Sequence, residues 1–213
     1  MRLKNGDIIV FAGDSITDSG KTNNAPLGYG YVNLFYNLLL VKYPELKVSI
    51  INAGISGNTV VDLLDRWEDD ILSYKPNWIS ILIGINDLYR TLGGETIFNP
   101  NNYYVNLKRI LSYTREVLED NVKFILMTPF YISRSKLKDT FRAKVLDLLP
   151  QYVEKVKLLS SEFSAIYIDL YETFKRIAEM REPNTYAPEP VHPNFTGHLV
   201  IAMKLINAIE SID

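Results

Sequence analysis

The chain contains no cysteine and only two histidines among its 213 residues. Without cysteine it can form no disulfide, no zinc–thiolate site and no cysteine nucleophile. Two histidines also give little support to a catalytic zinc site. We therefore expect no metal and no other cofactor. The absence of cysteine fits a reducing compartment, and we expect a cytoplasmic protein.

A surplus of basic residues is missing as well, since 23 Lys and Arg stand against 25 Asp and Glu. This balance argues against nucleic acid or an anionic membrane as a partner. No run approaches the 18 apolar residues of a membrane span, and the first apolar run is too short for a signal peptide. The G-x-S-x-G nucleophile elbow and the glycine-rich nucleotide-binding loops are also absent.

Five short apolar runs, rich in β-branched and aromatic residues, are present instead. Nearly continuous apolar character is typical of parallel strands buried on both faces. Helical patterns alternate with these runs, and Pro150 is expected to start or kink the fourth of them. This alternation predicts one domain over 1–213, a three-layer α/β/α sandwich around a doubly wound, five-stranded parallel sheet of the flavodoxin type. The expected strands are 7–13, 47–53, 77–84, 122–129 and 164–170, and the expected helices are 29–43, 59–74, 102–120, 146–163 and 194–209.

Three polar or glycine-containing segments directly follow the first three predicted strands, where sheets of this kind place their sites. Ser15 in "GDSITDSG" is a candidate nucleophile, although a serine N-cap is an alternative interpretation. Gly57 in "NAGISGNTV" offers a backbone amide to an oxyanion, or is simply a turn glycine before a cap at Asn58 or Thr59. Asn86 in "GINDLYR" offers a side-chain amide, or forms an Asx turn. Together they indicate a hydrolytic site.

Both histidines lie in "EPVHPNFTGH", residues 189–198. His192 is the candidate general base, and Asn194 is expected to cap the last helix and so fix the backbone beside it. Glu189 is the candidate carboxylate for His192 Nδ1, which would leave Nε2 free for the Ser15 proton. The alternatives are a capping or packing role for His192, and a backbone carbonyl as its partner while Glu189 faces solvent. His198 is interpreted as structural.

The blocks "GDSIT", "NAGISGNT", "GINDLYR" and "EPVHPNFTGH", in this order, resemble the four signature blocks of the SGNH hydrolases, also called the GDSL esterase/lipase family. The resemblance implies that Ser15 is the nucleophile and His192 the base. It also implies an oxyanion hole formed by the Ser15 amide, the Gly57 amide and the Asn86 side chain. The family has Asp-x-x-His where this chain has Glu189-x-x-His192.

The segments "LGYGYV", "DLLDRWEDD" and "LMTPFYI" look like those of bacterial acetylxylan esterases in this superfamily, which carry a bulky aromatic residue where this chain has Pro188. The resemblance implies a serine esterase for acetyl groups on xylo-oligosaccharides or similar small esters. A lysophospholipase or thioesterase, and a non-catalytic carbohydrate-binding relative, stay open as alternatives, as does a homo-oligomer. Further candidates for substrate contacts are Asp14, Tyr89 and Arg90, whereas Arg66 and Trp67 are expected to pack on a helix face.

Overall fold

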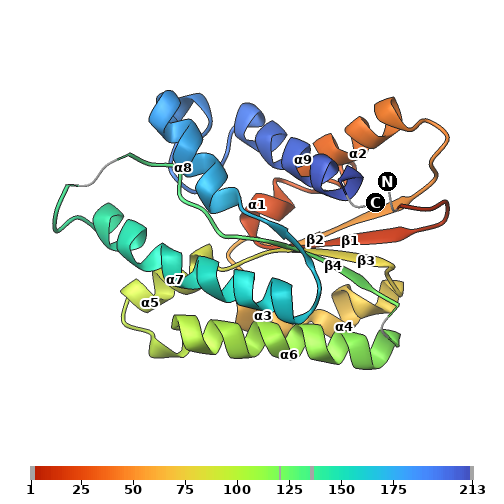
Figure 1. Ribbon diagram of the computed structural model, residues 1–213, viewed down its shortest axis with the longest axis horizontal. Helices are drawn as coiled ribbons and strands as arrows, with labels where there is room; N and C mark the ends of the chain where they lie inside the picture. Colours follow the sequence, from red (N-terminus) through yellow and green to blue (C-terminus); the bar gives the residue numbers. More distant parts are fainter. Residues whose placement is uncertain (1–2, 120, 135–136, 212–213) are drawn as a thin grey trace.

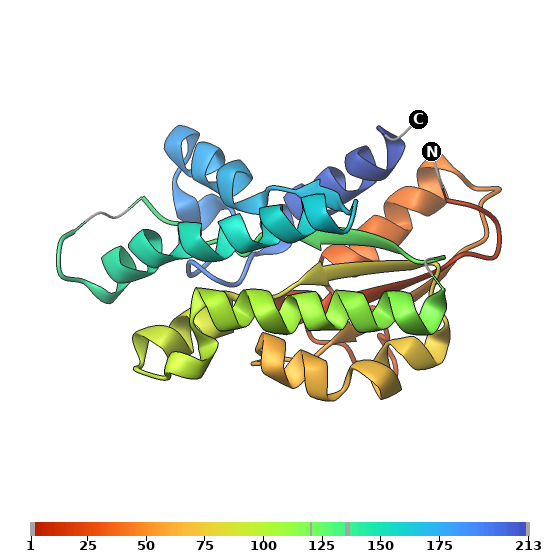
Figure 2. The ribbon, with the colours of Figure 1, turned by 60° about the horizontal axis from the view of Figure 1, so that its bottom comes forward.

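The computed structural model describes residues 3–119, 121–134 and 137–211. Its sheet has five parallel strands in the order β2-β1-β3-β4-β5. Figures 1 and 2 show α2, α8 and α9 on one face of this sheet and α3, α6 and α7 on the other. The expected three-layer α/β/α architecture is therefore confirmed.

The strands are β1 (Ile8–Gly13), β2 (Ser49–Gly54), β3 (Trp78–Leu82), β4 (Lys123–Met127) and β5 (Ile166–Ile168). The helices are α1 (Ser15–Asp18), α2 (Tyr31–Lys42), α3 (Val60–Asp65), α4 (Trp67–Asp70), α5 (Ile85–Leu92), α6 (Pro100–Leu118), α7 (Phe141–Glu162), α8 (Leu170–Met180) and α9 (Phe195–Glu210), with short 3₁₀ turns at Leu72–Tyr74, Thr96–Phe98 and Pro183–Thr185.

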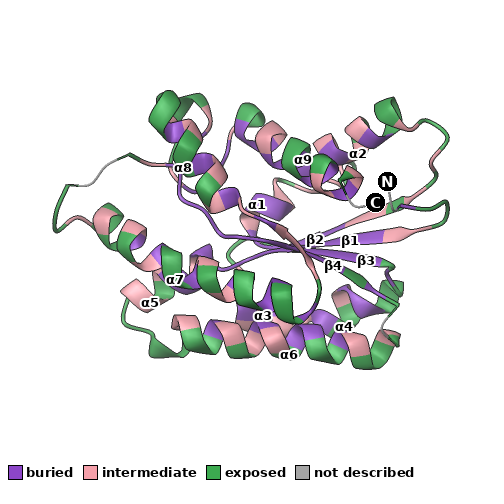
Figure 3. Cartoon of the chain, viewed as in Figure 1, coloured by how far each residue is buried: buried purple, intermediate pink, exposed green. Residues whose placement is uncertain are grey.

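The core lies on both faces of the sheet, as the apolar runs predict. Every residue of β3 is buried, and β1 is buried from Ile9 onward. Figure 3 shows this burial along the central strands, with exposed residues on the outer sides of the helices and in the loops. Strands that are apolar on both faces can be covered only by helices on both sides, which explains the three layers.

Three helix predictions need correction. The pattern at 59–74 forms α3, α4 and a 3₁₀ turn instead of one helix, because the chain leaves helical geometry at Arg66 and Ile71. Pro150 lies inside α7 and does not start it, since the side chain of Thr140 caps the helix ten residues before the proline, and a kink at Pro150 stays a prediction. The helix expected at 102–120 ends at Leu118, and Asp120 lies outside the described residues.

Candidate active site

The register of the sheet determines which segments meet at its carboxyl edge. Gly13, the last residue of β1, pairs with Gly54 at the end of β2 and with Leu82 at the end of β3. The three chain segments that follow these residues therefore leave the sheet side by side. They carry the serine, the glycine and the asparagine that the sequence singled out.

Ser15 is the first residue of α1, and the residue before it supplies the cap. The Asp14 carboxylate accepts a hydrogen bond from Ile16 N–H at 3.0 Å, so the alternative interpretation of Ser15 as the N-cap is wrong. The Ser15 hydroxyl is instead 2.8 Å from Nε2 of His192, 177 positions later in the chain. At this distance the imidazole can accept the hydroxyl proton.

Asp14, directly before Ser15, is buried, with only 1% of its surface exposed. Burial raises its pKa to about 7, although the Ile16 amide and the nearby His192 both favour the charged carboxylate. The side chain therefore caps α1 and adds a titratable group next to the nucleophile. A substrate contact by Asp14 stays a prediction.

Glu189 lies against His192, as the sequence suggested. Its Oε1 accepts hydrogen bonds from Nδ1 of His192 and, at 2.8 Å, from the His192 backbone N–H. Its Oε2 accepts from Val191 N–H at 3.0 Å. Burial alone would raise the pKa of Glu189, but these two N–H groups and the imidazole outweigh it and hold the pKa below its ordinary value. The extra methylene of Glu relative to Asp is thus accommodated by a tight turn around the carboxylate.

Contacts on both sides hold the loop that carries this pair. The carbonyl of Pro190 accepts from Ile132 N–H at 2.8 Å, which ties the loop to the segment after β4. Asn194 caps α9 by accepting from Gly197 N–H at 3.1 Å, as expected. His198 lies one turn further on, buried between α9 and α2, and its Nδ1 accepts from Tyr31 N–H at 3.2 Å.

Backbone and side-chain N–H groups suited to an oxyanion also lie at this edge. Gly57 has a positive φ of 83°, which favours glycine. Within the described parts of the chain, neither Ser15 N–H nor Gly57 N–H donates to a protein acceptor. Asn86 uses one N–H of its amide on the carbonyl of Asn58, at 2.9 Å, which fixes the amide and leaves its second N–H unused. Such prearranged donors can stabilise the negative charge of a tetrahedral intermediate.

Sequence reasoning missed Asp87, the residue after Asn86. Its carboxylate is buried and accepts from Val60 N–H at 3.1 and 3.2 Å, joining α5 to the start of α3. Burial raises the pKa of Asp87 to about 7, and the neighbouring Asp14 adds to this effect. The sequence shows a charged residue directly after Asn86 in "GINDLYR", but the sequence alone does not reveal that this residue is buried.

Tyr89 and Arg90 lie on the following turn of α5. Tyr89 is half-buried, packs edge-on against Phe141, and has its pKa raised by burial and by Tyr131. Arg90 is exposed and forms an ion pair with Glu95 at 3.6 Å. Tyr89 therefore packs against Phe141 and Tyr131, whereas Arg90 pairs with a residue just beyond the end of α5. A substrate contact for either one stays a prediction.

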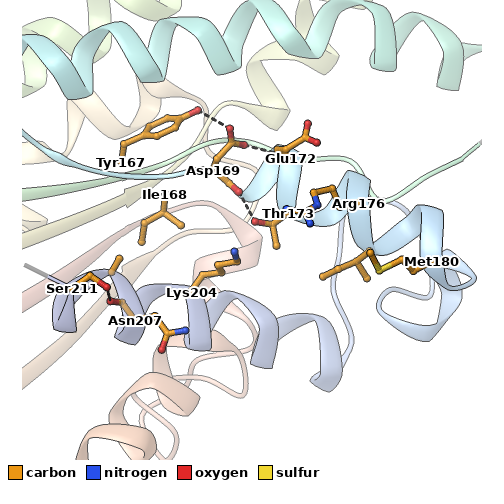
Figure 4. A pocket seen from close by; sticks show the side chains of 12 residues that line it. Tyr167, Ile168, Asp169, Glu172, Thr173, Arg176, Met180, Lys204, Asn207 and Ser211 are labelled. Carbon is orange, nitrogen blue, oxygen red and sulfur yellow. Dashed lines mark hydrogen bonds between the residues drawn. The ribbon is translucent and has the colours of Figure 1, made fainter.

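Two cavities differ in their relation to the site. One of about 450 Å³ includes Glu189 and its flanking Pro188 and Pro190 in its wall, together with Arg142. The other, of about 640 Å³, lies between α8 and α9, where Figure 4 shows the side chains that line it. It contains none of the residues proposed for the site, whereas the lining of the cavity beside Glu189 includes that residue but neither Ser15 nor His192.

Comparison with known proteins decides the family. The GDSL-like Lipase/Acylhydrolase family matches residues 11–200. The chain belongs to this family. It is 35% identical to an acetylxylan esterase of Geobacillus stearothermophilus, over 98% of this chain and 96% of that protein. A crystal structure of this relative superimposes with a TM-score of 0.85 at 34% identity, covering 98% of this chain and 96% of that one.

A second solved structure, a putative GDSL-like lipase from Parabacteroides merdae, has a TM-score of 0.90 at 31% identity and covers 98% of both chains. Solved catalytic mutants of the Geobacillus esterase change a serine, an aspartate and a histidine, with the aspartate three residues before the histidine. This is the spacing of Glu189 and His192. Another variant of that esterase changes a tryptophan directly before the aspartate, where this chain has Pro188. The chain is a carboxylic ester hydrolase.

Proposed function

We propose that the protein is a serine esterase that removes short acyl groups, acetyl above all, from carbohydrate such as xylo-oligosaccharides. The observation that carries the proposal is the hydrogen-bonded series from Ser15 through His192 to Glu189, beside unused N–H groups at the same sheet edge. The choice of acetyl and of carbohydrate rests on the likeness to the Geobacillus acetylxylan esterase.

In the proposed mechanism Ser15 Oγ attacks the ester carbonyl while Nε2 of His192 takes its proton. The oxyanion forms against the amides of Ser15 and Gly57 and the side chain of Asn86, each donor being worth about 3–4 kcal/mol in comparable hydrolases. Glu189 accepts the Nδ1–H and stabilises the imidazolium. The alcohol leaves with the proton from His192, and a water molecule then hydrolyses the acyl-enzyme along the same route.

Covalent labelling tests the nucleophile. A fluorophosphonate probe should modify the wild-type protein, and Ser15→Ala should abolish the modification. Because Ser15 caps no helix and fills no core position, its loss of a hydroxyl should leave the fold intact. Well-folded wild type that resists the probe would favour a non-catalytic carbohydrate-binding relative.

A series of p-nitrophenyl esters from acetate to dodecanoate tests the acyl group. We expect kcat/KM to be highest at acetate and to fall with each added pair of methylenes. A maximum at octanoate or longer would instead indicate a lysophospholipase or thioesterase with an acyl tunnel. Acetate release from acetylated xylo-oligosaccharides, followed by NMR, then tests the alcohol.

A further inference from the structure

Arg66 interrupts the helical pattern that begins at Thr59. Helix α3 ends at Asp65 and α4 begins at Trp67, and Arg66 between them has φ −107° and ψ 9°. This change of direction turns its side chain inward instead of along a helix face. Only 14% of the side chain is exposed, which is low for an arginine and calls for a buried set of partners.

Each of the three guanidinium nitrogens of Arg66 has its own partner. Nε donates to Oδ1 of Asn58 at 2.7 Å, and Nη2 donates to the carbonyl of Gly13 at 3.3 Å. Nη1 pairs with Asp70 at 2.9 Å, one turn further along the chain. The first two partners lie on different strand-end segments, so one planar group bridges two loops.

These two loops carry the proposed oxyanion donors. Asn58 follows Gly57 directly, and its carbonyl is the acceptor that fixes the amide of Asn86. Gly13 precedes Asp14 and Ser15, and its carbonyl also accepts from Ile55 N–H at 3.1 Å. Through Asn58 and Gly13, Arg66 is therefore linked to all three segments that supply N–H groups to the site.

We propose that Arg66 is a positioning residue of the oxyanion hole, holding the Gly57–Asn58 turn against the end of β1. The proposal rests on the esterase function above and deepens it. A planar, permanently charged fork suits this role, because it reaches Asn58 and Gly13 in fixed directions at once. A lysine has one compact ammonium and cannot reproduce this geometry.

The first test compares Arg66→Ala, Arg66→Lys and Asp70→Asn on p-nitrophenyl acetate. A loosely held catalytic group costs on the order of 100-fold in rate, so Arg66→Ala should lower kcat by about this factor with KM within a few-fold. Arg66→Lys should lower it by roughly 10-fold. Asp70→Asn, the matched control, removes the ion pair but leaves both bridging hydrogen bonds, and should stay within about threefold of wild type.

A transition-state probe separates positioning from plain stability. An alkylboronic acid forms a tetrahedral adduct with a serine nucleophile, so its inhibition constant should rise in Arg66→Ala by about the factor lost in kcat. Added guanidinium ion at concentrations below those that unfold the protein should restore part of the rate. Asn58→Ala should cost much less in the Arg66→Ala background than alone, because the two changes remove the same link.

The outcomes distinguish this proposal from the esterase function itself. Inactive wild type that is not labelled at Ser15 contradicts the esterase function. Active wild type with a folded Arg66→Ala variant of unchanged kcat and boronate affinity contradicts the positioning role alone. If Arg66→Ala does not fold, Arg66→Lys and Asn58→Ala give the same decision, and full activity in both would overturn the proposal.

Discussion

The two histidines lie six residues apart and have opposite surroundings. The side chain of His192 is 55% exposed, with Nδ1 on the Glu189 carboxylate and Nε2 on the Ser15 hydroxyl. His198 is only 7% exposed, and its Nδ1 accepts a hydrogen bond from Tyr31 N–H. Burial lowers the pKa of His198 to about 4.

The difference shows that the partner of Nδ1 decides what a histidine can do. A carboxylate accepts a hydrogen bond from Nδ1–H, which keeps the proton on Nδ1 and leaves Nε2 as a base. A backbone N–H needs a bare Nδ1, so the proton of His198 resides on Nε2, which faces Ser19 at 3.4 Å. One histidine is thereby prepared for proton transfer and the other for holding α9 against α2.

The largest expected effect separates these two residues by activity. His192→Ala and Ser15→Ala should each lower kcat on the order of 10⁶-fold, as loss of a serine or histidine does in other serine hydrolases. His198→Asn, which keeps an acceptor near the position of Nδ1, should stay within a few-fold. Steady-state kinetics on p-nitrophenyl acetate measures all three. Comparable losses at both histidines would remove the distinction.

The second-largest expected loss of kcat concerns Glu189, the partner of His192. Glu189→Gln should keep the fold and lower kcat by roughly 10⁴-fold, because an amide can favour the wrong tautomer. Glu189→Asp should retain substantial activity, since it restores the Asp-x-x-His pattern of the family. If the Gln variant remains within a few-fold of wild type, His192 works with Ser15 alone and the carboxylate does not orient it.

Two glycines extend the comparison of a site residue with a structural counterpart. Gly57 and Gly94 have positive φ of 83° and 97°, and neither has an atom within 4 Å of an added Cβ. Alanine at either position should therefore cost a similar roughly 1–2 kcal/mol of stability from backbone strain. Only Gly57→Ala should also lower kcat, by about 100-fold, by moving an oxyanion donor. Equal kinetics in the two variants would argue against a role for the Gly57 amide.

The smallest effect is on stability and belongs to His198. Its folded pKa of about 4 lies below the ordinary 6.5, so between these values the unfolded chain binds more protons than the folded one. Stability should fall as the pH drops through this window, by up to about 3 kcal/mol from His198. Urea unfolding of wild type and His198→Asn from pH 7 to 4 isolates this contribution, because Asp14 and Asp87 titrate in both. A constant difference between the two proteins would contradict it.

Much of the fold follows from local pattern. The five strands fall inside the predicted apolar runs or extend one residue beyond them, and Asn194 caps α9 as expected. The start of α7 and the pattern at 59–74 were misjudged for a common reason. Helix limits depend on caps and tertiary contacts, such as those of Thr140 and Arg66, which apolar periodicity does not report.

The sequence predicts those residues of the site that directly follow strands of the sheet. Ser15, Gly57 and Asn86 follow three adjacent strands, and the register of the sheet brings the ends of these strands together. Asp87 was not singled out, and Arg66 was expected only to pack on a helix face, because their burial and their hydrogen bonds to distant backbone groups arise only in the fold. Such hydrogen bonds do not produce a regular pattern of residue types in the sequence.

Imidazole ¹⁵N NMR tests the central claim most directly, because the protein has only two histidines to assign. At a pH where both rings are neutral, the account predicts opposite tautomers: a proton on Nδ1 of His192 and a proton on Nε2 of His198. The spectrum of His198→Asn identifies which signals belong to which ring. If His192 instead carries its proton on Nε2, it cannot accept the Ser15 proton in the resting enzyme, and the proposed triad is wrong.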